Sequence, residues 1–271
     1  MMYVLEQSHG IREVKHMLKR VYLCHDTLMG LCSALYDAWK ERREDGNAGI
    51  AFYGMLEQEL FCEYVDVTES EQKMMALTHM IQKNLGMEAY TRIYYAAKST
   101  DRNKGTAIFQ TLVAARDIKD SRKIMEHLTN PFVRKVFELS RKVGNELHFF
   151  KEILRFRELE GGILYAEIEP ENDILEGLIP HFENRFPLEN WMIHDKVRQM
   201  AVVHETGRHC ILVDDLTLDN ECLKQYSDSE QEILRLWKQF FRDISIPERE
   251  SYERQRQMVG LKYRKNMVEF E

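Results

Sequence analysis

Side chains that could carry out chemistry are concentrated in residues 181–198, which read HFENRFPLENWMIHDKVR. Five of them transfer protons or bind anions: His181, Arg185, His194, Asp195 and Arg198. Histidine exchanges protons near neutral pH, and arginine binds phosphate or carboxylate through two parallel hydrogen bonds. The segment therefore predicts a catalytic or anion-binding site, with phosphate as the expected anion.

The spacing of these five side chains predicts how they lie. His181 and Arg185 are four residues apart, so they share one face of a helix. His194 and Asp195 are neighbours in a strand, so their side chains start on opposite faces and a direct dyad is not expected. Asp195 is expected to pair with Arg198 across a turn. Two interpretations stay open: a functional site, or a polar network that fixes the helix onto the sheet.

A second candidate surface is a hairpin predicted around Gly161 and Gly162. A three-residue loop, Glu160-Gly161-Gly162, collects the apolar residues on one face, whereas a loop of two or four residues would mix arginines with them. The other face then carries Arg155, Arg157, Tyr165 and Glu167. If the chain touches nucleic acid, we expect Arg155, Arg157 and Tyr165 to take part, because arginine with an aromatic ring suits backbone contact and base stacking.

Other motifs with known chemistry are absent from the sequence. It has no glycine-rich phosphate loop, no Cys-x-x-Cys, no helical His-x-x-x-His pair and no Gly-x-Ser-x-Gly elbow. A turn at Thr206–Gly207 would place His204 opposite His209, close enough to share a metal, although two surface imidazoles are the simpler interpretation. We expect no metal and no cofactor.

Composition bounds the class of protein. The 271 residues are 44% hydrophobic and carry a net charge of −7. A protein that holds DNA mainly through phosphate contacts is usually basic, so any such contact must use local patches, for which 15–20, 40–43 and 151–157 are candidates. The five cysteines are scattered: Cys24, Cys32, Cys62, Cys210 and Cys222. We expect a cytoplasmic protein with no membrane span, no disulfide framework and no iron–sulfur cluster of its own.

The predicted elements give an α+β fold. Five helices are expected: from Asp26 or Thr27 to about residue 44, over 68–86, over 87–98, over 104–117 and from 130 to about 154. Short strands are expected at 21–24 and 60–67, and a loop at 43–49. Asp26 or Thr27 should cap the first helix, and Thr68 with Glu71 should form a capping box. Gly86 should end the helix that begins there.

From about residue 154 the hydrophobic period shifts towards two. The hairpin should be followed by a helix over 172–185, by three strands within 191–215 and by a capped amphipathic helix over 227–244. This pattern predicts a largely helical N-terminal half, then a small antiparallel sheet with packed helices. We expect a single domain, with subdomains 1–150 and 151–271 as the alternative.

Residues 146–203 carry several short motifs in a fixed order. They include Glu-x-His, Arg-Phe, the turn Glu169–Pro170, His-Phe-x-x-Arg-Phe and Trp-x-Ile-His-Asp-x-x-Arg. Together these motifs resemble a bacterial family described as probable DNA metabolism proteins, which contain a domain of unknown function. Weaker similarity extends to 22–39 and 236–249, and thus over most of the chain.

The resemblance implies a role in DNA metabolism or repair beside a companion radical-SAM protein. In some relatives the domain is fused to a uracil-DNA-glycosylase-like domain. The chain departs from the family at His25-Asp26-Thr27, where Asp-Gly-Ser is usual, at Phe149, where a basic residue is usual, and in its tail, which lacks the usual Pro and Trp. These changes put any role of those segments in doubt, whereas 181–198 matches.

Two classes of function therefore stay open. One is an accessory or DNA-handling subunit that works with the radical-SAM partner. The other is an enzyme in its own right, which acts on nucleic acid or nucleotides through the cluster of His, Asp and Arg side chains. A structural adaptor is a weaker third interpretation. The acidic balance of the chain favours a subunit over a free DNA clamp.

Overall fold

The protein is described by a computed structural model that covers residues 19–41, 47–57, 59–215, 223, 225–244, 251–264 and 267. The predicted basic patches at 15–20 and 40–43 lie partly outside these residues, and Cys222 lies wholly outside them. The chain divides into two compact units, Met1–Gly144 and Asn145–Glu271, with the division inside helix α5 (Pro131–Ile153). Both units contain helices and a sheet, which confirms the α+β class. The predicted domain boundaries stay a prediction.

The sheet of the N-terminal unit has three parallel strands in the order β2-β1-β3. They are β1 (Lys19–Cys24), β2 (Ala48–Phe52) and β3 (Cys62–Asp66). Sequence analysis predicted the first and third strands but placed the start of β2 in a loop. The β2 sequence AGIAF is rich in alanine and glycine, which are depleted in strands, so its pattern gave no strand signal.

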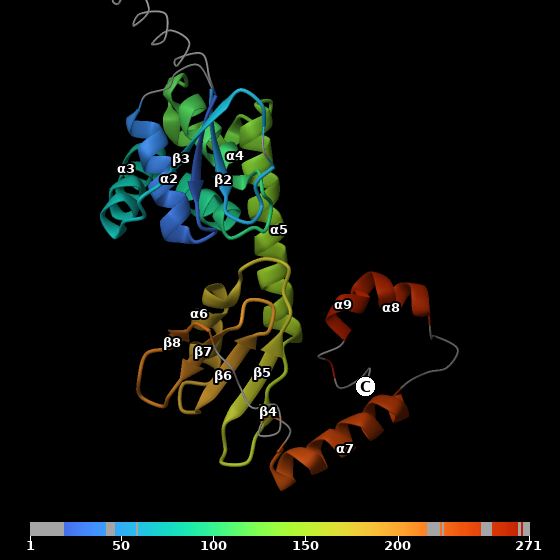
Figure 1. The fold of residues 1–271 in the computed structure, drawn as a ribbon. Helices are drawn as coiled ribbons and strands as arrows, with labels where there is room; N and C mark the ends of the chain where they lie inside the picture. The colour runs from blue at the N-terminus through green and yellow to red at the C-terminus, as the bar shows by residue number, and fades with distance from the viewer. Residues whose placement is uncertain are drawn as a thin grey trace, which may run out of the picture. The chain divides into compact units, whose positions relative to one another are not determined.

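Helices pack around this sheet (Figure 1). They are α2 (Leu28–Lys40), α3 (Glu71–Ala97), α4 (Lys104–Arg116), the 3₁₀ helix η1 (Ser121–Glu126) and the first part of α5. Thr27 caps α2 as predicted, because its side chain accepts a hydrogen bond from the amide of Gly30. The predicted capping box is wrong: α3 begins after Ser70, which makes no side-chain cap. Gly86 interrupts α3 with a φ of +87°, a conformation that glycine adopts freely.

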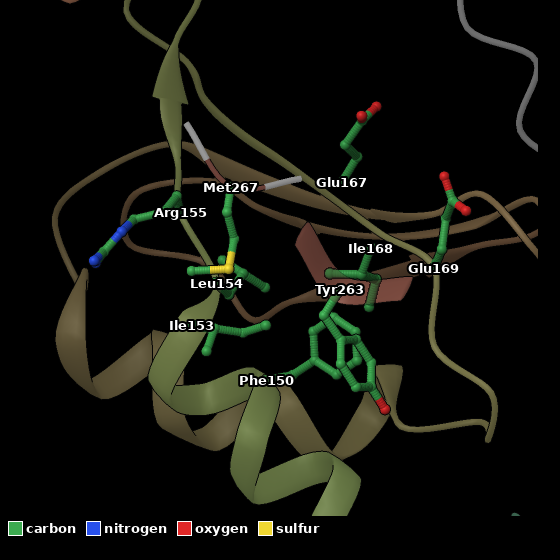
Figure 2. Close-up of a pocket in the computed structure, with 9 residues that line it drawn as sticks. All are labelled: Phe150, Ile153, Leu154, Arg155, Glu167, Ile168, Glu169, Tyr263 and Met267. Atoms are coloured by element: carbon green, nitrogen blue, oxygen red, sulfur yellow. The ribbon is translucent and has the colours of Figure 1, made fainter. Parts of the chain in front are cut away.

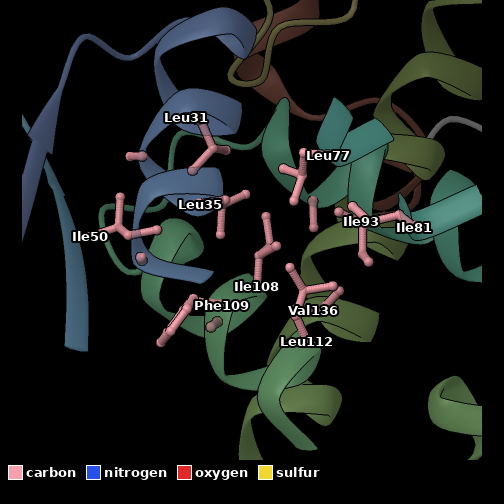
Figure 3. Packing of buried hydrophobic residues seen from close by; sticks show 14 of the residues in the cluster. Leu31, Leu35, Ile50, Leu77, Ile81, Ile93, Ile108, Phe109, Leu112 and Val136 are labelled. Carbon is pink, nitrogen blue, oxygen red and sulfur yellow. The ribbon is translucent and has the colours of Figure 1, made fainter. Parts of the chain in front are cut away.

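One face of the parallel sheet and the helices enclose the core of this unit (Figure 3). Side chains from every helix of the unit meet there, among them Leu31, Leu77, Ile108, Ile124 and Val136. The helix faces are apolar at helical spacing, which is why the predicted helices correspond well to those observed.

The sheet of the C-terminal unit has five strands in the order β4-β5-β6-β7-β8. They are β4 (Arg157–Glu158), β5 (Leu164–Ile168), β6 (Trp191–Asp195), β7 (Met200–His204) and β8 (Ile211–Val213). The predicted antiparallel sheet is only partly right, because β5 and β6 are parallel. The helix between them, α6 (Leu175–Arg185), returns the chain to the start of the sheet, and such a crossover makes the two strands parallel.

The hairpin loop has the predicted length. Arg157 lies opposite Tyr165 and Glu158 opposite Leu164, and the amide of Leu159 donates to the carbonyl of Ile163. Three residues, 160–162, therefore form the loop. Gly161 and Gly162 have φ values of +96° and +78°, which explains why glycine stands at both positions.

Helix α6 covers one face of the mixed sheet, where Phe182 packs edge-on against Trp191. Strand alternation places Tyr165 and His194 on the opposite face. The chain continues with α7 (Asp228–Ile244), α8 (Tyr252–Met258) and α9 (Leu261–Arg264). Within the described residues, no helix is long and apolar enough to cross a membrane.

Two helical glycines provide a matched test of the N-terminal core. A Cβ on Gly105 would lie 2.7 Å from Cγ2 of Ile50, whereas a Cβ on Gly144 would meet nothing within 4 Å. Gly105→Ala should lower the free energy of unfolding by about 1–3 kcal/mol through overpacking. Gly144→Ala should raise it by about 0.5–1 kcal/mol through helix propensity. Urea unfolding measures both, and a shift in the same direction for the two variants would contradict this packing.

Candidate functional site

Asp195 and Arg198 form the predicted ion pair at the end of β6. Nη1 of Arg198 lies 2.9 Å from Oδ2 of Asp195, and the Asp195 side chain is fully buried. Its Oδ1 accepts hydrogen bonds from the amides of Val197 and Arg198, at 2.9 and 3.1 Å. Burial raises the pKa of Asp195, and the guanidinium and the two amides oppose that rise.

The remaining hydrogen bonds of Arg198 point into the protein. Nη1 also donates to the carbonyl of Pro170 at 3.3 Å, and Nη2 donates to the carbonyl of Glu171 at 2.8 Å. Its guanidinium thus already has a carboxylate and two carbonyls as acceptors. This arrangement fits a structural role for Arg198 better than the capture of an external anion.

The same loop is held from its other side by Glu146 of α5. The two carboxylate oxygens of Glu146 accept hydrogen bonds from the amides of Glu171 and Asn172, both at 2.8 Å. The side chain of Asn172 adds a bond of 2.6 Å, and the hydroxyl of Tyr263 adds one of 3.1 Å. Asp195, Arg198, Glu146 and the loop at 170–172 therefore form one polar network, called the α5–β6 network below.

His194 lies on the other face of the sheet and belongs to a different group. Its Nδ1 is 3.1 Å from the hydroxyl of buried Tyr165. Burial lowers the pKa of His194 and raises that of Tyr165, so both side chains are neutral at pH 7. The hydroxyl and Nδ1 share one hydrogen bond, and Nε2 of His194 is buried without a hydrogen-bond partner among the described residues.

His181 and Arg185 remain on α6. Nε2 of His181 is also buried without a described partner, and burial lowers its pKa. The guanidinium of Arg185 lies 5.6 Å over the ring of Phe186. Across the part of the chain that the structure describes, no hydrogen bond or ion pair joins these two residues to His194, Asp195 or Arg198. The structure brings together Asp195 and Arg198 but does not gather all five predicted residues.

The hairpin arginines rest on aromatic rings that sequence analysis did not identify. The guanidinium carbon of Arg155 lies 5.6 Å over Trp237, and that of Arg157 lies 5.5 Å over Tyr226. Nη1 of Arg157 also donates to the hydroxyl of Tyr226 at 2.8 Å. The exposed role predicted for Tyr165 is wrong: it shares the expected face but is only 5% exposed, since its hydroxyl turns inward to His194.

These two arginines line a groove of about 230 Å³ beside α7, called the α7 groove below. Its lining residues are Arg155, Phe156, Arg157, Glu230, Ile233, Leu234 and Trp237. Ile233 is 57% exposed and Trp237 is 37% exposed, so the groove offers both apolar and cationic contacts. The sequence did predict an amphipathic helix over 227–244. It could not show that the apolar side of this helix lies beside Arg155 and Arg157, and so it did not reveal the groove.

A second concavity of the C-terminal unit is far smaller (Figure 2). It has a volume of about 10 Å³, which is room for roughly one water molecule. Tyr263 packs against Phe150 at its base, while Glu167 and Glu169 lie at its rim. This space is too small for an organic ligand.

The alternative of a metal ion shared by His204 and His209, at the turn between β7 and β8, is wrong. Val203 pairs with Ile211, so the register places Cys210, and not His209, opposite His204. His204 is buried, stacks on Trp191 and bonds through Nδ1 to the carbonyl of Glu189 at 2.8 Å. Among the described residues, no group of three or more His, Cys, Asp or Glu side chains could hold a metal ion. Trp191 itself has no exposed surface, so it packs in the core.

Comparison with known protein families matches residues 102–269 to DUF4130, a domain of unknown function. The matched range includes α4, α5 and nearly all of the C-terminal unit, and thus both the α5–β6 network and the α7 groove. No curated protein matches the chain.

The buried ion pair can be compared with an exposed pair of the same geometry. Arg208 and Glu205 are also three residues apart and 2.9 Å from each other, but both are exposed. Arg198→Ala should lower the free energy of unfolding by about 3–5 kcal/mol, because it leaves the Asp195 carboxylate buried and unpaired. Arg208→Ala should cost at most about 1 kcal/mol. Chemical denaturation measures both, and equal small losses would show that Arg198 is free for a functional role.

The lowered pKa of His194 predicts a pH dependence of stability. Between the folded and unfolded pKa values the unfolded chain binds more protons, so stability falls as the pH drops below about 6.5. His194→Gln removes this group, and its melting temperature should fall less than that of the wild type between pH 7.5 and 5.5. The matched variant His148→Gln changes an exposed histidine and should follow the wild type. An identical pH profile for all three proteins would contradict the burial of a neutral His194.

Proposed function

The chain belongs to the DUF4130 family, which is defined by a domain of unknown function. From its geometry and from the resemblance of residues 146–203, we propose that it is a DNA-handling subunit that works with a radical-SAM partner in DNA metabolism. The observation that carries the DNA contact is the α7 groove, in which two arginines lie beside exposed aromatic and aliphatic side chains. The radical-SAM partner rests on the family resemblance of residues 146–203.

The α7 groove offers contacts for both the phosphates and the bases of single-stranded DNA. Arg155 and Arg157 carry the positive charge that backbone phosphates require. The indole of Trp237 offers a stacking surface for a base, and such stacking is worth about 1–3 kcal/mol per base. Glu230, the acidic residue of the lining, accepts a hydrogen bond from the amide of Glu158 at 3.2 Å. Its carboxylate is thus partly occupied by the protein itself.

The charge of the groove lining favours an anionic ligand despite the acidity of the whole chain. The lining holds Arg155 and Arg157 against Glu230, whereas the complete chain has a net charge of −7. Two arginines are sufficient for salt-dependent binding to a short stretch of backbone. This charge supports a subunit that contacts DNA over a limited surface.

The exposed apolar side of α7 supports a protein partner as well. Leu236 and Phe240 are 50% and 53% exposed. Apolar side chains that recur at helical spacing commonly mark a face that packs against another protein. The alternative of an enzyme that acts through the cluster of His, Asp and Arg side chains has less support, because Arg198 is bonded to the loop at 170–171 and His181 and His194 lie on different elements.

Removal of the two groove arginines tests the proposal. Arg155→Ala/Arg157→Ala should weaken binding of a fluorescent single-stranded oligonucleotide by about tenfold or more, as expected when charge-assisted contacts are lost. It should also flatten the dependence of log K on log salt by about 1.4, which is about 0.7 for each of two contacts to a single strand. Trp237→Ala should lose roughly 1–3 kcal/mol of binding free energy without a change in that slope. Fluorescence anisotropy over a salt series measures all three effects.

The control carries the same change of charge on another surface. Arg134→Ala/Arg141→Ala removes two exposed arginines of α5 and should bind like the wild type. If both double variants lose affinity equally, the binding is non-specific and the α7 groove is not the interface. If neither loses affinity, DNA contact through this groove is excluded.

A further inference from the structure

The carboxyl ends of the three parallel strands in the N-terminal unit bring together a set of polar residues that the proposed function does not use. His25 and Asp26 follow β1, Tyr53 follows β2, and Asp66 ends β3. Strand β1 pairs with β2 on one side and with β3 on the other, so the strand order switches direction at β1. In open parallel sheets, ligands bind outside the carboxyl ends of the strands at such a switch in strand order.

His25 and Glu69 form a hydrogen-bonded dyad at this edge. Oε1 of Glu69 lies 2.8 Å from Nδ1 of His25 and accepts a second bond of 2.9 Å from the His25 amide. The Glu69 side chain is 18% exposed and the His25 side chain is 69% exposed. A carboxylate bonded to Nδ1 keeps the proton there, so Nε2 is left as a proton acceptor on the far side of an accessible ring.

Neighbouring residues hold the dyad in place. The ring of Tyr53 lies 4.9 Å from that of His25, and its hydroxyl donates to Oδ1 of Asp66 at 2.6 Å. Gly30 permits the close approach of α2, since a Cβ there would lie 2.7 Å from Oε1 of Glu69 and 2.6 Å from the carbonyl oxygen of His25. The imidazole is thus oriented by a carboxylate and an aromatic ring, as a general base must be.

A second carboxylate is fixed next to the dyad. Oδ1 of Asp26 lies 2.6 Å from the ammonium of Lys104. Lys104 is 3% exposed, donates to the carbonyl of Ser99 at 2.5 Å and lies 5.1 Å over the ring of Phe52. Burial of this lysine anchors Asp26, whose carboxylate keeps part of its surface accessible.

The net charge of the side chains around His25 indicates which kind of transition state they would stabilise. Asp26, Asp66 and Glu69 are three carboxylates, and among the described residues Lys104 is the one ammonium that is paired with them. This excess of negative charge opposes acyl transfer, whose transition state develops an oxyanion. It favours glycosyl transfer to water, whose transition state resembles an oxocarbenium ion and develops positive charge.

We propose that His25 and Glu69 form a general-base dyad that activates water for hydrolysis of a glycosidic bond in an uncharged sugar compound. Nε2 of His25 takes a proton from water as the water oxygen bonds to the anomeric carbon. The bond from that carbon to the leaving group breaks, and its electron pair goes to the leaving group, which departs as an anion, while the imidazolium returns its proton to bulk water. Asp26 faces the developing positive charge, and Tyr53, 42% exposed, packs against a planar leaving group. This site is independent of the α7 groove.

The test uses the full chain and the chromogenic probe 4-nitrophenyl β-D-ribofuranoside, whose leaving group is flat and whose sugar is uncharged. The wild type should release 4-nitrophenolate above the buffer rate, and His25→Ala should lower that release by about 100-fold or to the buffer rate. Glu69→Gln should lower kcat with little change in KM, because Glu69 positions His25 and does not touch the substrate. His148→Ala, which alters an exposed histidine paired with Glu152 on α5, should keep the wild-type rate.

Nitrogen NMR gives a readout that does not depend on the choice of sugar. In the wild type at neutral pH, the ring proton of His25 should reside on Nδ1. A proton on Nε2 would overturn the dyad, and so would release of 4-nitrophenolate that is absent in the wild type or unchanged in His25→Ala. Equal melting temperatures of the wild type and the variants show that a lost rate does not come from unfolding.

Discussion

The C-terminal unit depends on how one buried carboxylate, Asp195, is compensated. A fully buried ionised carboxylate is tolerated only when its lone pairs are met, and here two amides and the Arg198 guanidinium meet them. Arg198 must then stay in place, and it does so by bonding the loop at 170–171, which Glu146 holds from α5. The crossover that makes β5 and β6 parallel begins in this loop. The sheet topology and the polar network therefore support each other.

Local features of the fold were predictable from sequence because they depend on neighbouring residues. Thr27 caps α2 through an amide three residues away, and Gly161 with Gly162 fixes a three-residue loop by its backbone conformation. Two features were not predicted, because they depend on residues that are far apart in the sequence. Strand β2 is recognisable only by its pairing with β1, and the parallel pairing of β5 with β6 is set by the path of α6. Both depend on tertiary contacts that periodicity does not encode.

The same difference between local and long-range contacts explains which parts of the candidate site could be predicted. The pairing of Asp195 with Arg198 followed from a spacing of three residues, and the structure confirms it. What Arg198 does was beyond the sequence, since its other acceptors are main-chain carbonyls at 170 and 171 that no side-chain pattern reveals. Tyr165 was assigned to the correct face but to the wrong environment. Parity fixes the face of a strand residue, whereas burial depends on what covers that face.

Long-range pairs also explain why the edge of the N-terminal sheet was overlooked. Glu69 is 44 residues from His25, and Lys104 reaches Asp26 from a third element. In the sequence, His25-Asp26-Thr27 stood out only as a helix cap and as a departure from a family pattern. In the fold, the same residues occupy the end of the central strand, where a base and a carboxylate are held rigidly beside an exposed ring. The two units thus offer opposite electrostatics: arginines over aromatic rings suit an anion, and carboxylates around an imidazole suit a centre that gains positive charge.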